Sequence, residues 1–237
     1  MRLILHPERT TLVFVIFVIL LTTANAVLMV VYYHSEYTAV IDILPLFNVD
    51  MEKNIPTLYS SVALFFCSFL LLICGSIDWK NQNPRWIYWI GLTLIFFFLS
   101  LDEGLTIHEH INNYTDRYVN ATGLIYFPWV LPYGIGVSLI ALVYVSFLLR
   151  LPRQTAVLFV VSGGVFLMGA VGFEMLSARA AERYSYESIR YAVFYSVEEF
   201  LEMTGIVIFI YTLLKYLQGK NGSFSVTNTI KIHFDHH

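Results

Sequence analysis

Three apolar stretches of the chain contain acidic side chains with the potential for chemistry. LSLDEGLTIHEHI, residues 99–111, ends a long apolar run and carries Asp102, Glu103, His108, Glu109 and His110. YAVFYSVEEFLEMTG, residues 191–205, carries Glu198, Glu199 and Glu202, and GAVGFEMLSARAA, residues 169–181, carries Glu174. Ionisable residues inside a bilayer cost about a few kcal/mol each and by default mark a functional site.

Helical spacing predicts that most of the first group shares one face. If one helix continues to residue 110, Asp102, Glu103, Glu109 and His110 occupy roughly a third of its circumference at about 100° per residue. His108 alone points elsewhere, and we interpret it as an interfacial or packed histidine.

The last acidic stretch shows the same clustering. Glu198, Glu199 and Glu202 fall within about 100° of helical arc, and Tyr191 and Tyr195 lie on the same face. We therefore expect this helix to present carboxylates and phenols together.

Glu174 lies among small residues. Gly163, Ala170, Ala178 and Ala181 are expected to stack above and below it on one helix face, and small residues let helix backbones approach closely. The sequence thus predicts a third helix that brings a carboxylate to the same site.

Carboxylates that share one cavity cannot all be ionised without a cation, because like charges raise each other's pKa values. Either they share protons, as in a relay, or metal ions neutralise them. We predict a metal site, with Fe, Mn or Zn as candidate ions and these ligands: Glu103, His110, Glu174, Glu199 and Glu202. Four further residues are expected to act as neighbouring groups, proton carriers or hydrogen-bond donors: Asp102, Glu109, Glu198 and Tyr195. The structural alternative is that the acids form interhelical hydrogen bonds and ion pairs with Arg179, Arg183 or Arg190.

The elements that must position these residues are membrane spans. The chain has 237 residues, is 57% hydrophobic and only 13% charged, and has a mean hydropathy of +0.67. Soluble domains are nearer a quarter charged, so the composition predicts an all-α polytopic membrane protein. Runs of about 20 apolar residues indicate six spans, near residues 11–33, 57–77, 86–110, 127–149, 156–178 and 189–217. A polar tail, residues 218–237, follows them.

Charge asymmetry predicts the orientation. The N-terminus, the second and fourth loops and the tail carry basic residues: Arg2, Arg9, Lys80, Arg85, Arg150, Arg153, Lys215 and Lys220. The positive-inside rule then places both termini in the cytoplasm, with a bacterial inner membrane as the expected location. All three acidic groups would then lie in the outer half of the membrane. The net charge of −3 and the lack of a basic tract exclude nucleic acid as an expected partner.

DE…IHE at residues 102–109 and EEFLEMTG at residues 198–205 resemble a pair of motifs in uncharacterised bacterial multi-pass membrane proteins. The resemblance implies a similar membrane region and carries no activity. CAAX-type intramembrane proteases have an arginine after their paired glutamates, which is missing here. Ceramidase-like hydrolases bind zinc through three histidines, and the spacing of His108 and His110 does not fit that pattern.

The sequence therefore favours a membrane protein that binds metal in the outer half of the bilayer and performs oxidation or hydrolysis on a lipid-soluble substrate. Two alternatives stay open. One is an ion- or proton-coupled transporter or channel, in which the same acids bind and release a cation. The other is a non-catalytic subunit or assembly factor that contacts partner membrane proteins.

Overall fold

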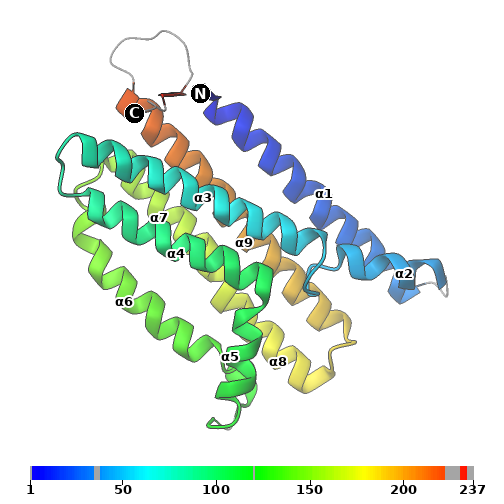
Figure 1. The fold of residues 1–237 in the computed structure, drawn as a ribbon. Coiled ribbons are helices and arrows are strands. Elements are labelled where there is room, and N and C mark those ends of the chain that lie inside the picture. Colours follow the sequence, from blue (N-terminus) through cyan, green and yellow to red (C-terminus); the bar gives the residue numbers. More distant parts are fainter. Residues whose placement is uncertain (1, 35–37, 120, 222–229, 234–237) are drawn as a thin grey trace.

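Six long helices form the body of the protein in the computed structural model, which describes residues 2–34, 38–119, 121–221 and 230–233. Each is long and apolar enough to cross a bilayer, which is compatible with an integral membrane protein. They are α1 (Pro7–His34), α3 (Ile55–Lys80), α4 (Trp86–Leu105), α6 (Val130–Leu148), the continuous run of α7 (Arg153–Leu167), η2 (Met168–Phe173) and α8 (Glu174–Tyr184), and α9 (Ile189–Asn221). Figure 1 shows these helices crossing the molecule in the same general direction. The predicted helical fold with six helices long enough to span a membrane is confirmed.

Helix α9 is the centre of the bundle. It packs against α1, α3, α7, η2 and α8, and with α3 it is the most buried of the six spans. The largest core cluster joins the Leu213 and Leu217 region of α9 to Leu70 and Leu71 of α3 and to Trp89 of α4. This core lies toward the end where α9 terminates, so the opposite end of the bundle is free to be polar.

Helix α4 ends before the predicted end at residue 110. It stops at Leu105, and Thr106 adopts a left-handed conformation with φ 56° and ψ 42° while its side chain is buried. A β-branched residue in this region is a genuine backbone outlier, and it breaks the helix. The chain then continues as a separate short helix, α5 (Ile107–Thr115). The single helix face predicted for residues 102–110 is therefore wrong.

A π-helical turn, η2, interrupts the fifth span directly before Glu174. Because the turn adds residues to the helical period, positions before and after it no longer share one face. The predicted small-residue face is consequently wrong for Gly163, where a Cβ would have no neighbouring atom within 4 Å. The close approach occurs at Gly169, where a Cβ would lie 2.6 Å from the Glu198 carbonyl oxygen of α9.

Both termini lie at one end of the bundle. Strand β1 (Arg2–Leu5) pairs antiparallel with β2 (Ile230–His233) beyond the end of α9. In Figure 1 the N and C labels lie together, and α5 and α8 lie at the other end of the molecule. Of the tail expected at residues 218–237, the structure places the first part in α9 and residues 230–233 in β2, and the rest lies outside the described residues.

The connection between α1 and α3 folds over the end of the bundle opposite the termini. It contains the short helix α2 (Thr38–Phe47) and a loop that reaches Asn54. Asn54 caps α3 by accepting a hydrogen bond from the Thr57 backbone N–H at 3.1 Å, and Pro56 occupies the first turn, where it removes no helical hydrogen bond. This loop places two further acidic residues, Asp50 and Glu52, at the end of the bundle opposite the termini.

Candidate functional site

An acidic cavity of about 360 Å³ opens at the end of the bundle away from the termini. Nine of the 17 acidic residues of the chain line it, together with one histidine. The nine acids are Asp50, Glu52, Asp102, Glu103, Glu109, Glu174, Glu198, Glu199 and Glu202. No lysine or arginine is among the described residues that line it. The cavity is therefore strongly acidic in composition.

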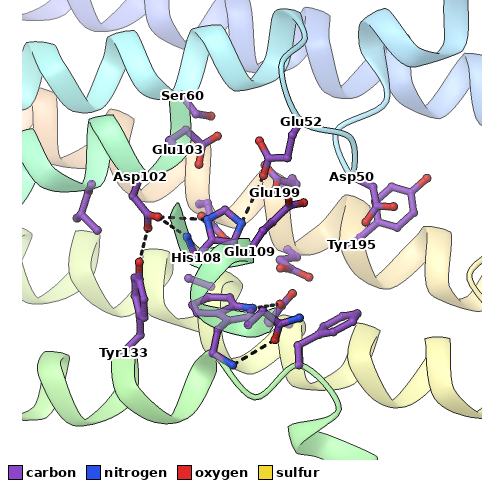
Figure 2. A pocket seen from close by; sticks show the side chains of 18 of the residues that line it. Asp50, Glu52, Ser60, Asp102, Glu103, His108, Glu109, Tyr133, Tyr195 and Glu199 are labelled. Atoms are coloured by element: carbon purple, nitrogen blue, oxygen red, sulfur yellow. Dashed lines mark hydrogen bonds and ion pairs between the residues drawn. The ribbon is translucent and has the colours of Figure 1, made fainter. Parts of the chain in front are cut away.

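His108, in the first turn of α5, links three elements across this cavity (Figure 2). Its backbone N–H donates to Asp102 Oδ1 at 2.7 Å, and its Nδ1 lies 3.4 Å from the same oxygen. Its Nε2 lies 3.4 Å from Glu52 Oε1, in the loop before α3. The Tyr133 hydroxyl of α6 donates to the other Asp102 oxygen at 2.9 Å. Tyr133, Asp102, His108 and Glu52 therefore form one connected chain.

Electrostatics keep the His108 imidazole protonated. Burial lowers the pKa of His108, but the hydrogen bonds and charges of Asp102 and Glu52 outweigh it and raise the pKa to about 10. His108 is then a cation at neutral pH. It neutralises one charge in a cavity that holds nine carboxyl groups.

Two hydrogen-bond donors, Trp129 and Ser177, contact the carboxylates of Glu174 in α8 and Glu198 in α9. The indole Nε1 of Trp129 donates to Glu174 Oε1 at 2.8 Å. The Ser177 hydroxyl lies 3.0 Å from Glu198 Oε2 and 3.5 Å from Glu174 Oε2. Because a hydroxyl carries a single proton, Ser177 can donate to one of these neighbours at a time. Glu174 and Glu198 are thereby held side by side.

Asp50, in the loop that precedes α3, lies at the rim of the cavity. The Tyr191 hydroxyl donates to Asp50 Oδ1 at 2.6 Å. The Asp50 side chain is exposed to the water of the cavity mouth. The surrounding protein nevertheless displaces enough solvent to raise the pKa of Asp50 to about 6, with the charges of Glu174 and Glu52 acting in the same direction and the Tyr191 hydrogen bond opposing them.

Four cavity carboxylates differ from the others because no hydrogen bond or ion pair joins them to another described residue. They are Glu103 of α4, Glu109 of α5, and Glu199 and Glu202 of α9. Figure 2 shows Glu103, Glu109 and Glu199 around the space beside His108. Their oxygens are available to a ligand, and an unpaired carboxylate in such surroundings is costly unless a cation or proton neutralises it.

No three histidine, cysteine or acidic side chains of the described part of the chain converge closely enough to hold a metal ion as they stand. The donor chemistry is that of a hard cation, since the available groups are carboxylate oxygens. Both cysteines lie elsewhere, buried within α3.

A family model described as a domain of unknown function, DUF8692, matches residues 10–217. The chain belongs to this family. The matched range contains all of the residues that line the cavity. No curated protein matches the chain, and no solved structure does.

The cavity of this DUF8692 protein brings together nearly all of the residues predicted from the sequence. Asp102, Glu103, Glu109, Glu174, Tyr195, Glu198, Glu199 and Glu202 all line it. His110, predicted as a ligand, does not: its side chain is exposed, and Nδ1 lies 2.9 Å from the Thr106 carbonyl oxygen. His108, expected to point away, lines the cavity instead. The helix break at Thr106 turns the following residues, so that His108 faces the cavity and His110 faces away from it.

Several cavity residues were missed because they belong to none of the acidic helical patterns. Asp50 and Glu52 belong to a loop, which has no helical period to place them on a face. Trp129 and Tyr133 lie at the start of α6, where aromatic residues are typical of a membrane interface. No sequence pattern indicated that these residues meet Glu174 and Asp102.

The structural alternative is seen in part: Asp102, Glu174 and Glu198 accept hydrogen bonds from neighbouring elements, but the expected ion pairs with arginine are not found among the described residues. Arg179 and Arg183 line separate pockets on the surface, and Arg190 stacks over the Tyr184 ring at 4.4 Å. No ion pair of the described residues joins these arginines to an acid in the cavity. The negative charge of the cavity is therefore not neutralised from within by arginine.

Proposed function

We propose that this protein is an integral membrane protein that binds a divalent metal ion in the acidic cavity and uses it in chemistry on a lipid-soluble molecule. One observation carries the proposal: nine carboxyl groups face one cavity with a single cationic residue among its described lining, and four of them have no partner in the described part of the protein. Such a site favours a bound cation, because a cation removes the mutual repulsion of the carboxylates.

The ligands we propose are Glu103, Glu199 and Glu202. They come from two helices, α4 and α9, and none is engaged in a hydrogen bond with another described residue. An all-oxygen donor set suits Mn or Fe better than zinc, which more often takes histidine or thiolate ligands. Glu174 is less free to act as a ligand, because it accepts the Trp129 indole N–H.

The residues around the ligands would serve proton transfer and positioning. A bound divalent ion would supply Lewis acidity or an activated water. Asp102 is fixed by Tyr133 and His108, so the three can hold or pass a proton at the edge of the cavity. Glu109, at the exposed mouth, can exchange protons with water.

The cavity is proposed to face the outside of a bacterial inner membrane. The support is the basic character of the loops at the other end, which the positive-inside rule assigns to the cytoplasm. A transporter receives less support than an enzyme, because the core between the cavity and the terminal end is apolar and Asp78 there is paired with Lys220 at 2.7 Å. The exposed apolar residues of α6 do not favour an accessory subunit, since lipid would cover them equally well.

Metal analysis tests the proposal directly. Protein purified in detergent without chelators is expected to contain Mn or Fe in stoichiometric amount, or to bind Mn²⁺ in a titration after chelation. Glu199→Gln removes one ligand charge and is expected to weaken Mn²⁺ binding at least about tenfold, a cost of about 1.4 kcal/mol. Glu187→Gln, on an exposed residue outside the cavity, is the matched control and should bind as the wild type does. Absence of metal and of Mn²⁺ binding in the wild type would refute the proposal.

A further inference from the structure

An apolar groove adjoins the acidic cavity. It is lined by α3, α4, α7 and α9, including Leu92, Phe96, Phe159, Gly163 and Phe209, and has a volume of about 190 Å³. Four residues line both the groove and the cavity, one from each of these helices: Leu64, Leu99, Phe166 and Ile206. The two spaces therefore adjoin at these four residues, with apolar surroundings on one side and acidic surroundings on the other.

The described residues that line the groove offer a polar ligand no free side-chain hydrogen-bonding group. The one hydroxyl group among its described lining residues, on Ser162, already donates to the Phe159 carbonyl oxygen at 3.0 Å. Aromatic rings form its wall, with Phe96 stacked on Phe209 at 4.6 Å between centroids and Phe159 packed on Phe209 at 4.8 Å. A hydrocarbon chain is the ligand that such a surface suits.

The groove reaches the lipid-facing surface at Gly163. This glycine of α7 is exposed, and a Cβ at this position would meet no heavy atom within 4 Å. From Phe159 to Phe166 the groove follows α7 for roughly 10 Å at about 1.5 Å per residue, room for several methylene groups. A chain from the bilayer can thus enter at Gly163 and point its head toward the cavity.

Charge and aromatic content decide which head group fits. An anionic head is repelled by the nine carboxyl groups, whereas an ammonium group is attracted by them. Aromatic side chains also line the cavity, among them Trp129, Tyr133 and Tyr195, and aromatic faces attract alkylammonium ions. Six carboxyl groups of the cavity are not among the three proposed metal ligands and stay available to an ammonium group.

We infer that the lipid-soluble ligand of this protein is a long-chain amine, with its hydrocarbon chain in the groove between α4 and α7 and its ammonium group in the acidic cavity, beside the proposed metal ligands. This inference rests on the proposed function and names its substrate class. The head group supplies the selectivity, because the bilayer is as apolar as the groove and the chain alone gains little by leaving it.

The test uses the full-length protein in nanodiscs and a hexadecylamine that carries a photoreactive diazirine in its chain. Crosslinks mapped by mass spectrometry are expected on groove residues of α4 and α7. Unlabelled hexadecylamine should compete, while hexadecanol and hexadecyl sulfate should not. Gly163→Leu adds a side chain to the groove lining at a position where a Cβ meets no heavy atom within 4 Å, and it is expected to reduce groove labelling at least about tenfold. Gly164→Leu is the matched control, since it also has open space but does not line the groove.

The two proposals fail separately in this experiment. Mn²⁺ binding, measured on the same samples, should be unchanged in Gly163→Leu. If Mn²⁺ binds while labelling is spread evenly over the lipid-facing residues, or is equal in both leucine variants, the amine inference is wrong and the proposed function stands. Competition by the alcohol or the sulfate equal to that by the amine also overturns the inference. If labelling behaves as expected but no Mn²⁺ binds, the metal in the proposed function is wrong.

Discussion

His108 is the single basic side chain among the described residues that line the cavity. Its charge links α4 to the loop before α3. It holds Asp102 of α4 and Glu52 of the loop before α3, each at 3.4 Å from a ring nitrogen. Loss of the charge should therefore loosen the loop from the end of α4. The two contacts are ion pairs, and partly exposed pairs of this kind together contribute roughly 1–2 kcal/mol.

The stability that His108 contributes should depend on pH. Its pKa in the folded protein is about 10, above the value of about 6.5 in an unfolded chain. The contribution is then fully present below about pH 6.5 and is lost as the pH rises to 10. We expect His108→Gln to lower the Tm by about 2–8 °C at pH 6 and by much less at pH 10, as measured by thermal unfolding in detergent. His110→Gln, on the exposed neighbouring histidine, should change the Tm little at either pH, and a His108→Gln deficit that grows with pH would contradict the assignment.

Asp50 should make cation binding depend on pH near 6. Its pKa is raised to about 6 because the surrounding protein displaces solvent from it, so it carries a negative charge at pH 7.5 and loses it below pH 6. That charge strengthens the attraction for a divalent cation in the cavity, by roughly tenfold or less at a separation of about 7 Å or more in a dielectric near that of water. Asp50→Asn should therefore weaken Mn²⁺ binding at pH 7.5, and the difference from the wild type should vanish by about pH 5. Isothermal titration at both pH values measures this, and a difference that persists at pH 5 would count against it.

At the scale of elements, the π-helical turn sets the position of the acids. Gly169 of η2 packs against α9 at Glu198 and Glu202, where a Cβ would lie 2.6 Å from the Glu198 carbonyl oxygen and 2.9 Å from Glu202 Cγ. Backbone cannot yield easily at such a contact, so a methyl group there should push α9 away. The carboxylates of α9 would move with it.

Gly169→Ala should consequently lower both stability and cation affinity. Overpacking of this kind costs about 1–3 kcal/mol, or roughly 2–10 °C in Tm for a chain of this size. Gly172→Ala is a control within the same turn, because its nearest contact is the Met168 Cγ atom at an ordinary 3.9 Å. Thermal unfolding and Mn²⁺ titration of both variants measure the effect. Equal behaviour of the two would show that η2 does not position the acids.

The six spans and the grouping of most acids could be predicted from the sequence, because apolar length and helical period report directly on burial. The histidines could not be assigned in this way. Thr106 breaks the helix through a left-handed backbone conformation, and a threonine in the sequence does not predict such a conformation. The loop acids Asp50 and Glu52 were beyond prediction for another reason, since contacts across the fold set their positions and no periodic pattern exists in a loop.

At the scale of the whole molecule, both termini lie at one end and the acidic cavity at the other. The groove adjoins the cavity and includes the exposed Gly163, so the lipid ligand that we propose would approach the acids from within the bilayer. Which side of the membrane the cavity faces decides whether its cation comes from the cytoplasm or from outside. The basic residues near the termini favour the outside.

Single cysteines test this orientation. The native Cys67 and Cys74 are fully buried in α3, so they should not react with a membrane-impermeant maleimide. Glu187→Cys, between α8 and α9 at the cavity end, is expected to react in intact cells, because the site is exposed and would lie outside. Lys80→Cys, exposed at the end of α3 on the terminal side, should react only after the membrane is permeabilised. The opposite pattern would place the cavity on the cytoplasmic side, where the cell's own Mn or Fe pool would have to supply it.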